Sequence, residues 1–365
     1  MDKKLRVGVL FGGKSAEHEI SIRSAANIIE AIDRNKYDIM LIGIDREGEW
    51  SACDSAEFLP NKKIDSYFEY HRDNILALAP GQSNGSLIEI RKGNSIPRLD
   101  VVFPVLHGPM GEDGTVQGLL KLLDVPYVGS GVLGSAVGMD KDVMKRLLRD
   151  SRIPVAAWET VYSHERDKIE YGKIANNLGS PLFIKPANMG SSVGVHKVTR
   201  KDEFFEALED AFYFDSKVLV EEFIPGREIE CAVLGNENPA ASVPGEICTN
   251  HAFYSYKAKY IDENGAALNI PADLPESITE KIRGISLKSF KVLCCEGMAR
   301  VDCFLREDGK IYVNELNTIP GFTSISMYPM LWEATGIPYS ELIDRLITLA
   351  IERHEKERKL KSSYE

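Results

Sequence analysis

The sequence has no C-x-x-C pair, although it contains six cysteines, at positions 53, 231, 248, 294, 295 and 303. Cys294 and Cys295 are adjacent, which is too close for a disulfide of normal geometry. The distribution argues against a disulfide framework and against a zinc site built from paired cysteines. It is typical of a protein that stays reduced inside the cell.

Long apolar runs are also missing. No stretch approaches the roughly 18 consecutive apolar residues of a membrane-spanning helix. The N-terminal "MDKKLRVGVLFGG" contains no apolar segment of signal-peptide length before the fold begins. We therefore expect a soluble, cytoplasmic protein with no membrane partner.

Positive charge is in the minority. The chain carries 44 lysines and arginines against 55 aspartates and glutamates, a net charge of −11. Nucleic acids and anionic membranes bind basic surfaces, so this balance argues against both kinds of partner. What the chain does have is the composition of a globular protein, with 44% hydrophobic residues and enough length for a full core.

The 365 residues are sufficient for two or three domains. Residues 1–140 alternate strand and helix, as in "LRVGVLF", "EISIRSAANIIEAID" and "YDIMLIGID", which predicts a doubly wound, Rossmann-like α/β domain. Within it, the polar residues 51–97 are expected to be an insertion with a hairpin around "GSLIEIRKG". Residues 141–226 and 227–365 contain strands and helices without the regular alternation of residues 1–140, and we expect them to form two further units of α+β type.

The stretch "GVLFGGKS", residues 8–15, matches the phosphate-binding pattern G-x-x-x-x-G-K-[ST]. Such a loop needs four residues free to curl around phosphate, but here they continue the apolar run "LRVGVLF". That run predicts a buried parallel strand ending at Phe11, followed by a turn before a helix. The acidic Glu17 and Glu19 beside the turn favour a ligand with an ammonium group over phosphate.

The segment "MARVDCFLREDGKIYVNELN" predicts a β-hairpin with "REDG" as its turn. In that register Leu305 faces Lys310, Asp302 faces Val313, and Arg300 faces Glu315. Cross-strand partners share a face and side chains alternate along a strand. The four polar side chains that then emerge on one face are Arg300, Asp302, Glu315 and Asn317.

Two carboxylates, an amide oxygen and a guanidinium make a poor apolar core. Hard oxygen ligands suit Mg²⁺, particularly where phosphate completes the coordination shell. Arg300 beside them would neutralise charge on a phosphoryl group or an oxyanion. The alternative is a salt-bridged polar face of a sheet, and a register shifted by one residue would break the cluster.

Two segments contain residues suited to nucleotide. In "FIKPANMGSSVGV" Lys185 ends an apolar strand before a glycine- and serine-rich turn whose N–H groups suit phosphate, although a flexible hairpin is the alternative. "VEEFIPGRE" would offer backbone to a base and Glu228 to a ribose, but taken alone a plain hydrated strand end explains it better.

Two further segments are candidates for binding a small substrate. In "PVLHGPMGEDGTVQG", His107 follows an apolar strand at its carboxyl end, where open α/β sheets bind ligands. In "NTIPGFTSISMYP", Gly321 and the nearby hydroxyls suit a carboxylate or an oxyanion. A single histidine is more often structural, so His107 is open to both interpretations.

Together these segments resemble the D-alanine–D-alanine ligase family of the ATP-grasp superfamily. The matching motifs are "FGGKSAEHEIS", "HGPMGEDGTVQG", "MDKDVMK", "KPANMGSSVGV", "REIECAVLG", "ARVDCFL" and "NELNTIPGFTSIS". They extend from residue 7 to about 329. The resemblance implies an N-terminal substrate domain (1–140), a central ATP-grasp lobe (141–226) and a C-terminal ATP-grasp lobe (227–365).

The resemblance also implies the residues that bind the nucleotide and metal. Those for ATP are Lys141, Lys185 and Ser192 at the phosphates, with Glu221, Glu222, Ile224 and Glu228 at adenine and ribose. Glu222 stands where some relatives carry lysine. Asp302, Glu315 and Asn317 match the family's ligands for two Mg²⁺ (or Mn²⁺) ions.

For the amino-acid substrates, the resemblance implies a first D-alanine held at its ammonium by Glu17, with His107 beside it. The carboxylate of the second substrate would meet Ser326 and Met327, with Lys259 nearby. Arg300 and the N–H of Gly321 match the oxyanion site. ATP would phosphorylate the first D-alanine, and the second would displace phosphate, giving D-alanyl-D-alanine for peptidoglycan synthesis.

Tyr260, in "YKAKYID", matches the family tyrosine that hydrogen-bonds Ser191 and through it Glu17. Relatives that make D-alanyl-D-lactate lack it, so an amine is favoured as second substrate. D-alanine is expected, with D-serine open as an alternative because one hydroxyl is easily tolerated. The long loop 249–274 and the glycine-rich turn are candidates for a lid that excludes water.

Three other interpretations remain. A different ATP-grasp carboxylate–amine ligase would share the hairpin and Lys185, but would not need Glu17 with His107, Tyr260 and Ser326. A non-catalytic nucleotide-binding protein would have lost metal ligands, which are all present here. A P-loop hydrolase would depend on Lys14. The resemblance further implies a homodimer, which nothing in the residue spacing indicates.

Overall fold

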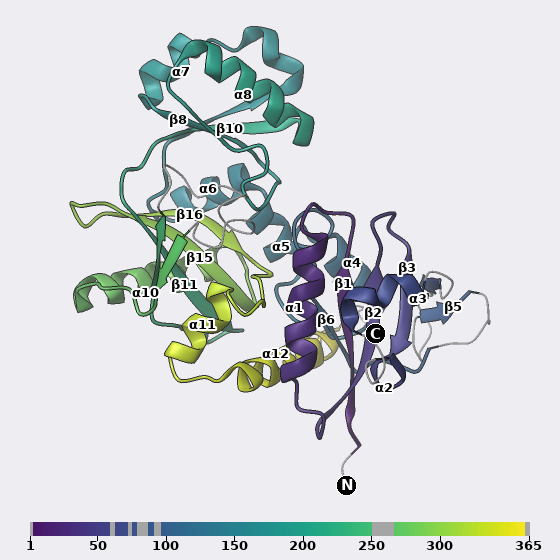
Figure 1. The fold of residues 1–365 in the computed structure, drawn as a ribbon. Coiled ribbons are helices and arrows are strands. Elements are labelled where there is room, and N and C mark those ends of the chain that lie inside the picture. The colour runs from purple at the N-terminus through teal and green to yellow at the C-terminus, as the bar shows by residue number, and fades with distance from the viewer. Residues whose placement is uncertain are drawn as a thin grey trace.

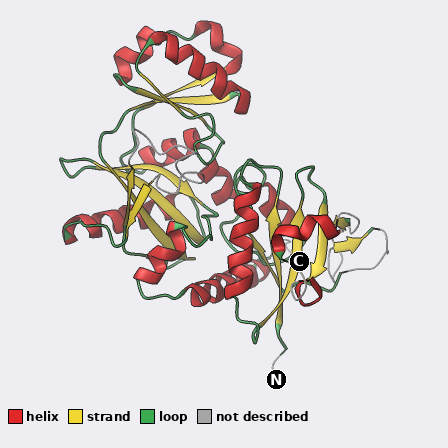
Figure 2. Cartoon of the chain, viewed as in Figure 1, coloured by secondary structure: helices red, strands yellow, loops and turns green. Residues whose placement is uncertain are grey.

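The computed structural model describes residues 3–58, 63–71, 75–78, 87–90, 96–249 and 266–361. Figures 1 and 2 show three main groups of strands with helices packed around them. The strands are β1 (Leu5–Gly12), β2 (Tyr37–Ile44), β3 (Trp50–Asp54), β4 (Leu76–Leu78), β5 (Leu87–Glu89), β6 (Val101–Pro104), β7 (Trp158–Tyr162), β8 (Leu182–Pro186), β9 (His196–Val198), β10 (Lys217–Glu222), β11 (Arg227–Gly235), β12 (Ala240–Ala241), β13 (Gly245–Thr249), β14 (Ala266–Asn269), β15 (Gly297–Leu305) and β16 (Ile311–Asn317).

The helices lie between and around these strands. They are α1 (His18–Ala31), α2 (Ser55–Phe58), α3 (Tyr67–His71), α4 (Thr115–Leu122), α5 (Val132–Met139), α6 (Lys141–Asp150), α7 (Tyr171–Leu178), α8 (Lys201–Phe214), α10 (Glu276–Val292), α11 (Met327–Ala334) and α12 (Tyr339–Arg358). Of the helices in the described ranges, none combines the length and the apolar content needed to span a bilayer.

The N-terminal sheet has the order β3-β2-β1-β6. β1 pairs in parallel with β2 and β6, and the edge strand β3 is antiparallel. Side chains alternate along β1, so Val7 and Val9 pack in one cluster with α1, whereas Leu10 packs in another with α4. Helices therefore cover both faces, which confirms the predicted doubly wound sheet.

β1 also shows whether "GVLFGGKS" forms a phosphate-binding loop. The strand runs through Gly8 to Phe11 and ends at Gly12, so the residues that a phosphate loop would need are paired in the sheet. Gly12 and Gly13 both have positive φ, near +92° and +95°, and turn the chain toward α1. The prediction of a strand and turn in place of a P-loop is confirmed.

The predicted hairpin within residues 51–97 is present in part. β5 pairs antiparallel with β4, and Ile90 extends the contact through a backbone hydrogen bond to Ile75. The first and last residues of the quoted segment lie outside the described ranges.

The second sheet, drawn in teal at the top of Figure 1, has the order β7-β10-β8-β9 and is antiparallel throughout. On β8, Leu182, Ile184 and Pro186 are buried under the helices, while Phe183 and Lys185 alternate to the opposite face. That face lies toward the third sheet, and it brings Lys185 toward β16.

The third sheet has the order β14-β13-β11-β15-β16, with β12 beside β11. The predicted register of its β15–β16 hairpin is wrong by one residue at the turn, because Leu305 pairs with Ile311 and not with Lys310. The turn is closed by hydrogen bonds from Arg306 N–H to the Lys310 carbonyl and from Gly309 N–H to the Arg306 carbonyl.

A β-bulge then restores the predicted face. Cys303 pairs with Val313, but Asp302 pairs with Glu315, which leaves Asn314 as the extra residue on β16. Asp302 therefore does not face Val313, and Arg300 faces Asn317 and not Glu315. Because the bulge shifts the alternation, the four polar side chains share one face even though the register is wrong.

The C-terminal helix joins distant parts of the chain. α12 runs beneath α1 in Figure 1, and its Leu342 and Leu346 share a core cluster with Val7 of the first sheet. Arg353 on α12 is buried, and its guanidinium donates to the carbonyls of Tyr127 and Gly129, the former at 2.8 Å. These contacts fix the third sheet relative to the first.

Candidate active site

Two neighbouring cavities lie against the β15–β16 hairpin. The hairpin cavity, about 240 Å³, is lined mainly by strands β8, β10, β11, β15 and β16. The loop cavity, about 120 Å³, is lined largely by residues from the turns that follow β1, β6, β8 and β16. The lining residues common to both are Gly190, Ser191, Glu230, Ile247 and Glu315.

The residues that line both cavities form a shared wall, and Arg300 anchors this wall through Glu230. Its guanidinium donates to both oxygens of Asp302, at 2.8 and 2.7 Å, and contacts Glu230 at 2.9 Å. Burial alone would lower the pKa of Arg300, but the carboxylates of Asp302 and Glu230 raise it well above its usual value. Asn317 donates its amide to Asp302 at 3.0 Å. The predicted cluster is thus assembled, with Glu230 as a member that the sequence did not reveal.

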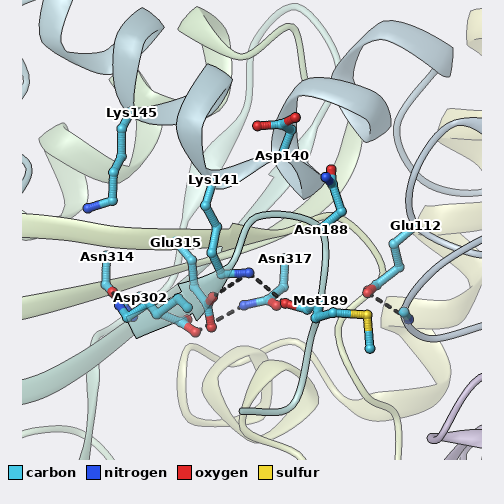
Figure 3. A network of polar contacts seen from close by, with 12 residues as sticks. Glu112, Asp140, Lys141, Lys145, Asn188, Met189, Asp302, Asn314, Glu315 and Asn317 are labelled. Atoms are coloured by element: carbon cyan, nitrogen blue, oxygen red, sulfur yellow. Dashed lines mark hydrogen bonds and ion pairs between the residues drawn. The ribbon is translucent and has the colours of Figure 1, made fainter. Parts of the chain in front are cut away.

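Lys141 connects the hairpin to the glycine-rich turn. Its ammonium lies 3.5 Å from Glu315 and donates to the carbonyl of Met189 at 2.7 Å, as Figure 3 shows. Lys141 is the first residue of α6, and Asp140 caps that helix by accepting from the N–H groups of Asp142 and Val143. The cap fixes the start of α6 and therefore the backbone position from which the Lys141 side chain extends.

The lining of the hairpin cavity fits divalent cations. Among its described residues are six acids, Glu221, Glu222, Glu228, Glu230, Asp302 and Glu315, against two lysines, Lys141 and Lys185. A polyphosphate would be repelled by such a surface unless cations intervened. Asp302, Glu315 and Asn317 together present carboxylate and amide oxygens, the donors that Mg²⁺ prefers.

The opposite end of the hairpin cavity is more apolar. Phe183, Phe223 and Ile224 line it, together with the buried carboxylate of Glu221. Lys185 donates to Glu221 at 2.8 Å and to the amide oxygen of the bulged residue Asn314 at 3.0 Å. A flat, partly polar ring would fit such a lining, with a charged group at its edge.

Two other predicted residues at this end have different surroundings. Glu222 lines the cavity, but its Oε1 accepts from the backbone N–H of Ala157 at 2.7 Å. Glu228 lines the cavity from β11.

The glycine-rich turn after β8 lines both cavities. Ser191 and Ser192 have φ near +51° and +59°, and Gly194 has φ near +66°. Left-handed backbone is uncommon for serine, and such conformations cluster at functional sites. Ser191 Oγ donates to the carboxylate of Glu17, the contact expected from the resemblance.

The N-terminal sheet supplies the acid of the loop cavity. Glu17 is buried and precedes α1, whereas Glu19 is exposed and pairs with Arg46 at 2.7 Å. Of the two acids that favoured an ammonium ligand, only Glu17 lines the cavity, because two residues along a helix turn Glu19 by about 200° to the surface.

His107 is buried at the wall of the loop cavity. Its Nδ1 lies 3.1 Å from the carbonyl of Ile319, which can only accept, so Nδ1 carries the proton. Its Nε2 lies 3.5 Å from Ser24 Oγ, and burial lowers its pKa. His107 is therefore neutral, and it ties the end of β6 to the segment after β16.

The segment after β16 forms the far wall. Ser326 Oγ accepts from the N–H of Thr323 at 2.9 Å and lies 2.8 Å from its hydroxyl. A Cβ on Gly321 would lie 2.7 Å from Ser326 Oγ, so a side chain there would displace the hydroxyl. Met327 follows at the start of α11 and lines the same cavity.

Glu112 is a site residue that sequence reasoning missed, although "HGPMGEDG" contains it. Its carboxyl accepts from the N–H of Gly108 at 3.0 Å, and burial together with the charge of Glu17 raises its pKa to about 8. Asn314 and Lys145 were missed as well. A bulge has no simple sequence signature, and a lysine on a helix reads as solvent-facing.

Two predicted residues, Lys259 and Tyr260, lie outside the described residues, as does most of the predicted lid 249–274. The other predicted site residues all line one or both cavities. The geometry alone does not assign which part of a nucleotide or of a substrate each residue binds.

Comparison with known proteins identifies the family. Residues 6–130 match a family model described as D-ala D-ala ligase N-terminus, and residues 147–348 match the one described as D-ala D-ala ligase C-terminus. The chain is 53% identical over 361 residues to the D-alanine–D-alanine ligase of Oceanobacillus iheyensis, covering 99% of each chain.

Solved structures agree with this. The D-alanine–D-alanine ligase from Coxiella burnetii superposes with a TM-score of 0.87 at 43% identity, covering 98% of this chain and 96% of that one. The D-Ala:D-Ser ligase from Enterococcus faecalis gives 0.85 at 37% identity, covering 95% and 100%. A D-alanine–D-alanine ligase from Bacillus anthracis complexed with ATP gives 0.72 at 30%, covering 97% and 99%. The chain belongs to the D-alanine–D-alanine ligase family.

Proposed function

We propose that this chain uses ATP to join two D-alanine molecules into D-alanyl-D-alanine. The observation that carries the proposal is that the two cavities meet at Glu315 and Ser191. A phosphoryl donor in the hairpin cavity would therefore end beside an amino acid in the loop cavity. The full-length similarity to D-alanine–D-alanine ligases supplies the identity of the two ligands.

For the nucleotide, the purine would occupy the apolar end, near Glu221, Glu222 and Ile224, and the ribose would lie by Glu228. Lys141, Lys185 and the turn residue Ser192 would hold the phosphates. This order is supported by the apolar side chains beside Glu221 and by the Lys141–Glu315 pair, whose carboxylate also lines the loop cavity. Both lysines are largely buried, so each would form stronger hydrogen bonds to phosphate than an exposed lysine.

Asp302, Glu315 and Asn317 would hold two Mg²⁺ or Mn²⁺ ions. When bound, these ions supply neutralisation of charge on the transferred phosphoryl group. Lys141 would leave Glu315 for phosphate. Arg300 would remain with Asp302 and orient its carboxylate.

For the first D-alanine, Glu17 would accept from the ammonium group. Ser191 would hold the carboxylate of Glu17, and His107 would hold the adjoining wall of the cavity. The carboxylate would then point to the shared wall, where phosphoryl transfer to it would occur. The neutral state expected for Glu112 near pH 7 would leave Glu17 as the charged partner of the ammonium.

For the second D-alanine, Ser326, Met327 and Lys259 would receive the carboxylate. Its amine would attack the acyl phosphate, forming the C–N bond, and inorganic phosphate would leave with the former carboxylate oxygen. Arg300 and the N–H of Gly321 would stabilise the oxyanion, each donor contributing about 3 kcal/mol. Tyr260 would act with Ser191 and Glu17 in positioning the first substrate.

The boundaries 1–140, 141–226 and 227–365 are proposed as the substrate domain and the two ATP-grasp lobes. Each contains one of the three main sheets. A homodimer and a cytoplasmic location, expected from the resemblance and from the sequence, are part of the same proposal.

D-serine is the second candidate for the second substrate. The similarity to a D-Ala:D-Ser ligase, with a TM-score of 0.85, favours testing it. One hydroxyl in a small polar pocket changes binding only modestly, so geometry alone does not reject D-serine.

The test is phosphate release from Mg-ATP with D-alanine, L-alanine, D-serine and D-lactate, each alone and each paired with D-alanine. We expect D-alanine alone to support release, with one D-alanyl-D-alanine formed per phosphate. Absence of release with every D-alanine mixture, in a protein that still binds ATP, would overturn the substrate assignment.

A further inference from the structure

Lys145 is a fully buried lysine beside the hairpin cavity. Its side chain has 0% exposure, and its ammonium lies 3.2 Å from Oε1 of Glu221, which is 2% exposed. It also lies 5.8 Å from the ring centroid of Trp158. Figure 3 shows it extending from α6 on the Asn314 side, apart from Lys141. Lys145 is not among the residues that line the hairpin cavity, whereas its partner Glu221 is, so Lys145 would act on a ligand there through Glu221.

Glu221 is held from two sides. Lys145 contacts one of its oxygens and Lys185 the other, the latter at 2.8 Å. Burial alone would raise the pKa of Glu221, but the two ammonium groups lower it below its usual value. An ionised carboxylate therefore stands at the apolar end of the cavity, opposite Phe183 across the β8–β10 pair.

A buried ion pair has little value for stability alone, because desolvation of both charges offsets their attraction. What the pair does secure is the chemical state of Glu221. An ionised carboxylate can only accept hydrogen bonds, whereas a protonated one can also donate. Each oxygen keeps accepting capacity beyond its lysine, so Glu221 still accepts from a ligand that enters the cavity.

We propose that Lys145 is a positioning residue that keeps Glu221 ionised and oriented, and thereby sets selectivity for a 6-amino purine over a 6-oxo purine. The proposal rests on the assignment of the hairpin cavity to a purine nucleotide. Adenine carries an amino donor at C6, which an ionised Glu221 accepts. Hypoxanthine and guanine carry an oxygen there, which the same carboxylate repels and a protonated one would bind.

The experiment measures binding of ATP and of ITP to the full chain by calorimetry, with Mg²⁺ and without amino acids. ITP carries an oxygen at C6 and a proton on N1, whereas ATP carries an amino group at C6 and a bare N1. The change in the ATP-to-ITP ratio between the wild type and the Lys145 variants therefore reports on the contact with Glu221. The wild-type protein should prefer ATP by at least about tenfold, the value of one hydrogen bond to a charged group. Lys145→Met and Lys145→Gln should each reduce this ratio about tenfold.

Arg149→Met is the matched control. Arg149 lies on the same helix and over the same Trp158 ring, at 4.9 Å, but does not line the cavity. Its loss should leave the ATP-to-ITP ratio unchanged. In steady-state assays the Lys145 variants should raise KM for ATP more than they lower kcat.

Two results would overturn the proposal: no ATP preference in the wild type, or an unchanged ratio in folded Lys145 variants, including the case in which both affinities fall by the same factor. If Lys145→Met does not fold, Lys145→Gln and the double variant Lys145→Met/Glu221→Gln decide the question. The amide can rotate to accept or donate, so the double variant should show almost no preference. A double variant that retains the preference would exclude Glu221 as the group that reads the base.

Because nucleotide binding is measured without amino acids, this result is independent of the substrate assignment. Intact selectivity with no dipeptide synthesis would count against the proposed function alone. Dipeptide synthesis with selectivity unaffected by Lys145 would count against the Lys145 proposal alone.

Discussion

The hairpin cavity and the loop cavity share a wall but are built differently. The first is lined mainly by strands, and its charges face one another in pairs such as Lys185–Glu221 and Lys141–Glu315. The second is lined by turns from four distant parts of the chain, and its acids Glu17 and Glu112 lie close enough for one to raise the pKa of the other. The strand-built cavity presents paired charges to a polyanion, and the loop-built cavity presents unequal acids to an ammonium group.

Replacement of Glu315, one of two carboxylates common to both cavities, should have the largest effect. Glu315→Gln removes a proposed metal ligand and the partner of Lys141, so kcat for phosphate release should fall about 1000-fold, equivalent to several kcal/mol of lost charge stabilisation. The measurement is steady-state release over a range of Mg²⁺ concentrations. Glu307→Gln, at the exposed tip of the same hairpin, is the control. If kcat for phosphate release in Glu315→Gln stayed within tenfold of the wild-type value, Glu315 would not link the two cavities in the reaction.

Arg300 is the second test of the shared wall. Arg300→Lys keeps a positive charge but loses the paired hydrogen bonds to Asp302, so kcat/KM should fall about 100-fold with little change in Tm. Arg300→Met leaves Asp302 and Glu230 without their cation and should cost about 3–5 kcal/mol of stability. Thermal melts with parallel kinetics check both, and full activity in Arg300→Lys would disprove the oxyanion role.

The pair of acids in the loop cavity predicts a pH dependence. Glu112 has a folded pKa of about 8 against an ordinary value of 4.5, so the native state binds the proton more tightly than the unfolded chain. The free energy of unfolding should therefore fall as pH rises from about 4.5 to about 8, by about 2–4 kcal/mol from this group. Glu112→Gln should flatten that slope, and the exposed Glu19→Gln should not.

Urea unfolding at several pH values measures this slope directly. An identical slope in the wild type and in Glu112→Gln would show that Glu112 is charged in the folded protein. The two carboxylates would then be equivalent, and the contrast between them would be lost.

The smallest expected effect is at the far wall of the loop cavity. In Gly321→Ala the new Cβ would lie 2.7 Å from Ser326 Oγ, so the hydroxyl must move and KM for the second D-alanine should rise about tenfold. Gly172→Ala on α7, where a Cβ meets nothing within 4 Å, is the control and should slightly stabilise the protein. An unchanged KM in Gly321→Ala would remove Ser326 from substrate binding.

The polar face of the β15–β16 hairpin, which contributes to both cavities, was largely predictable from the residues because side chains alternate along strands. Arg300, Asp302, Glu315 and Asn317 were brought together on one face, although the register at the turn was wrong. The bulge at Asn314 corrected the face, and no local pattern announced it. The doubly wound sheet was predictable for a related reason, because apolar strand segments and helical segments alternate regularly along residues 1–140.

The loop-built cavity was not predictable by periodicity. Glu17, His107, Gly321 and Ser326 are separated by long stretches, and only the resemblance to a family gathered them. Glu112 and Lys145 were missed because their importance depends on burial, which tertiary packing decides. Glu19 shows the reverse error, since it adjoins the site in sequence but points to solvent.

The most direct test of the account follows an oxygen atom. D-alanine labelled with ¹⁸O in both carboxylate oxygens is incubated with the enzyme, Mg-ATP and no other amino acid, and the released phosphate is analysed by mass spectrometry. Phosphorylation of the carboxylate where the two cavities meet predicts one ¹⁸O in each phosphate formed with dipeptide. Phosphate without the label would show that phosphoryl transfer does not pass through the carboxylate, and would contradict the proposed use of the shared wall.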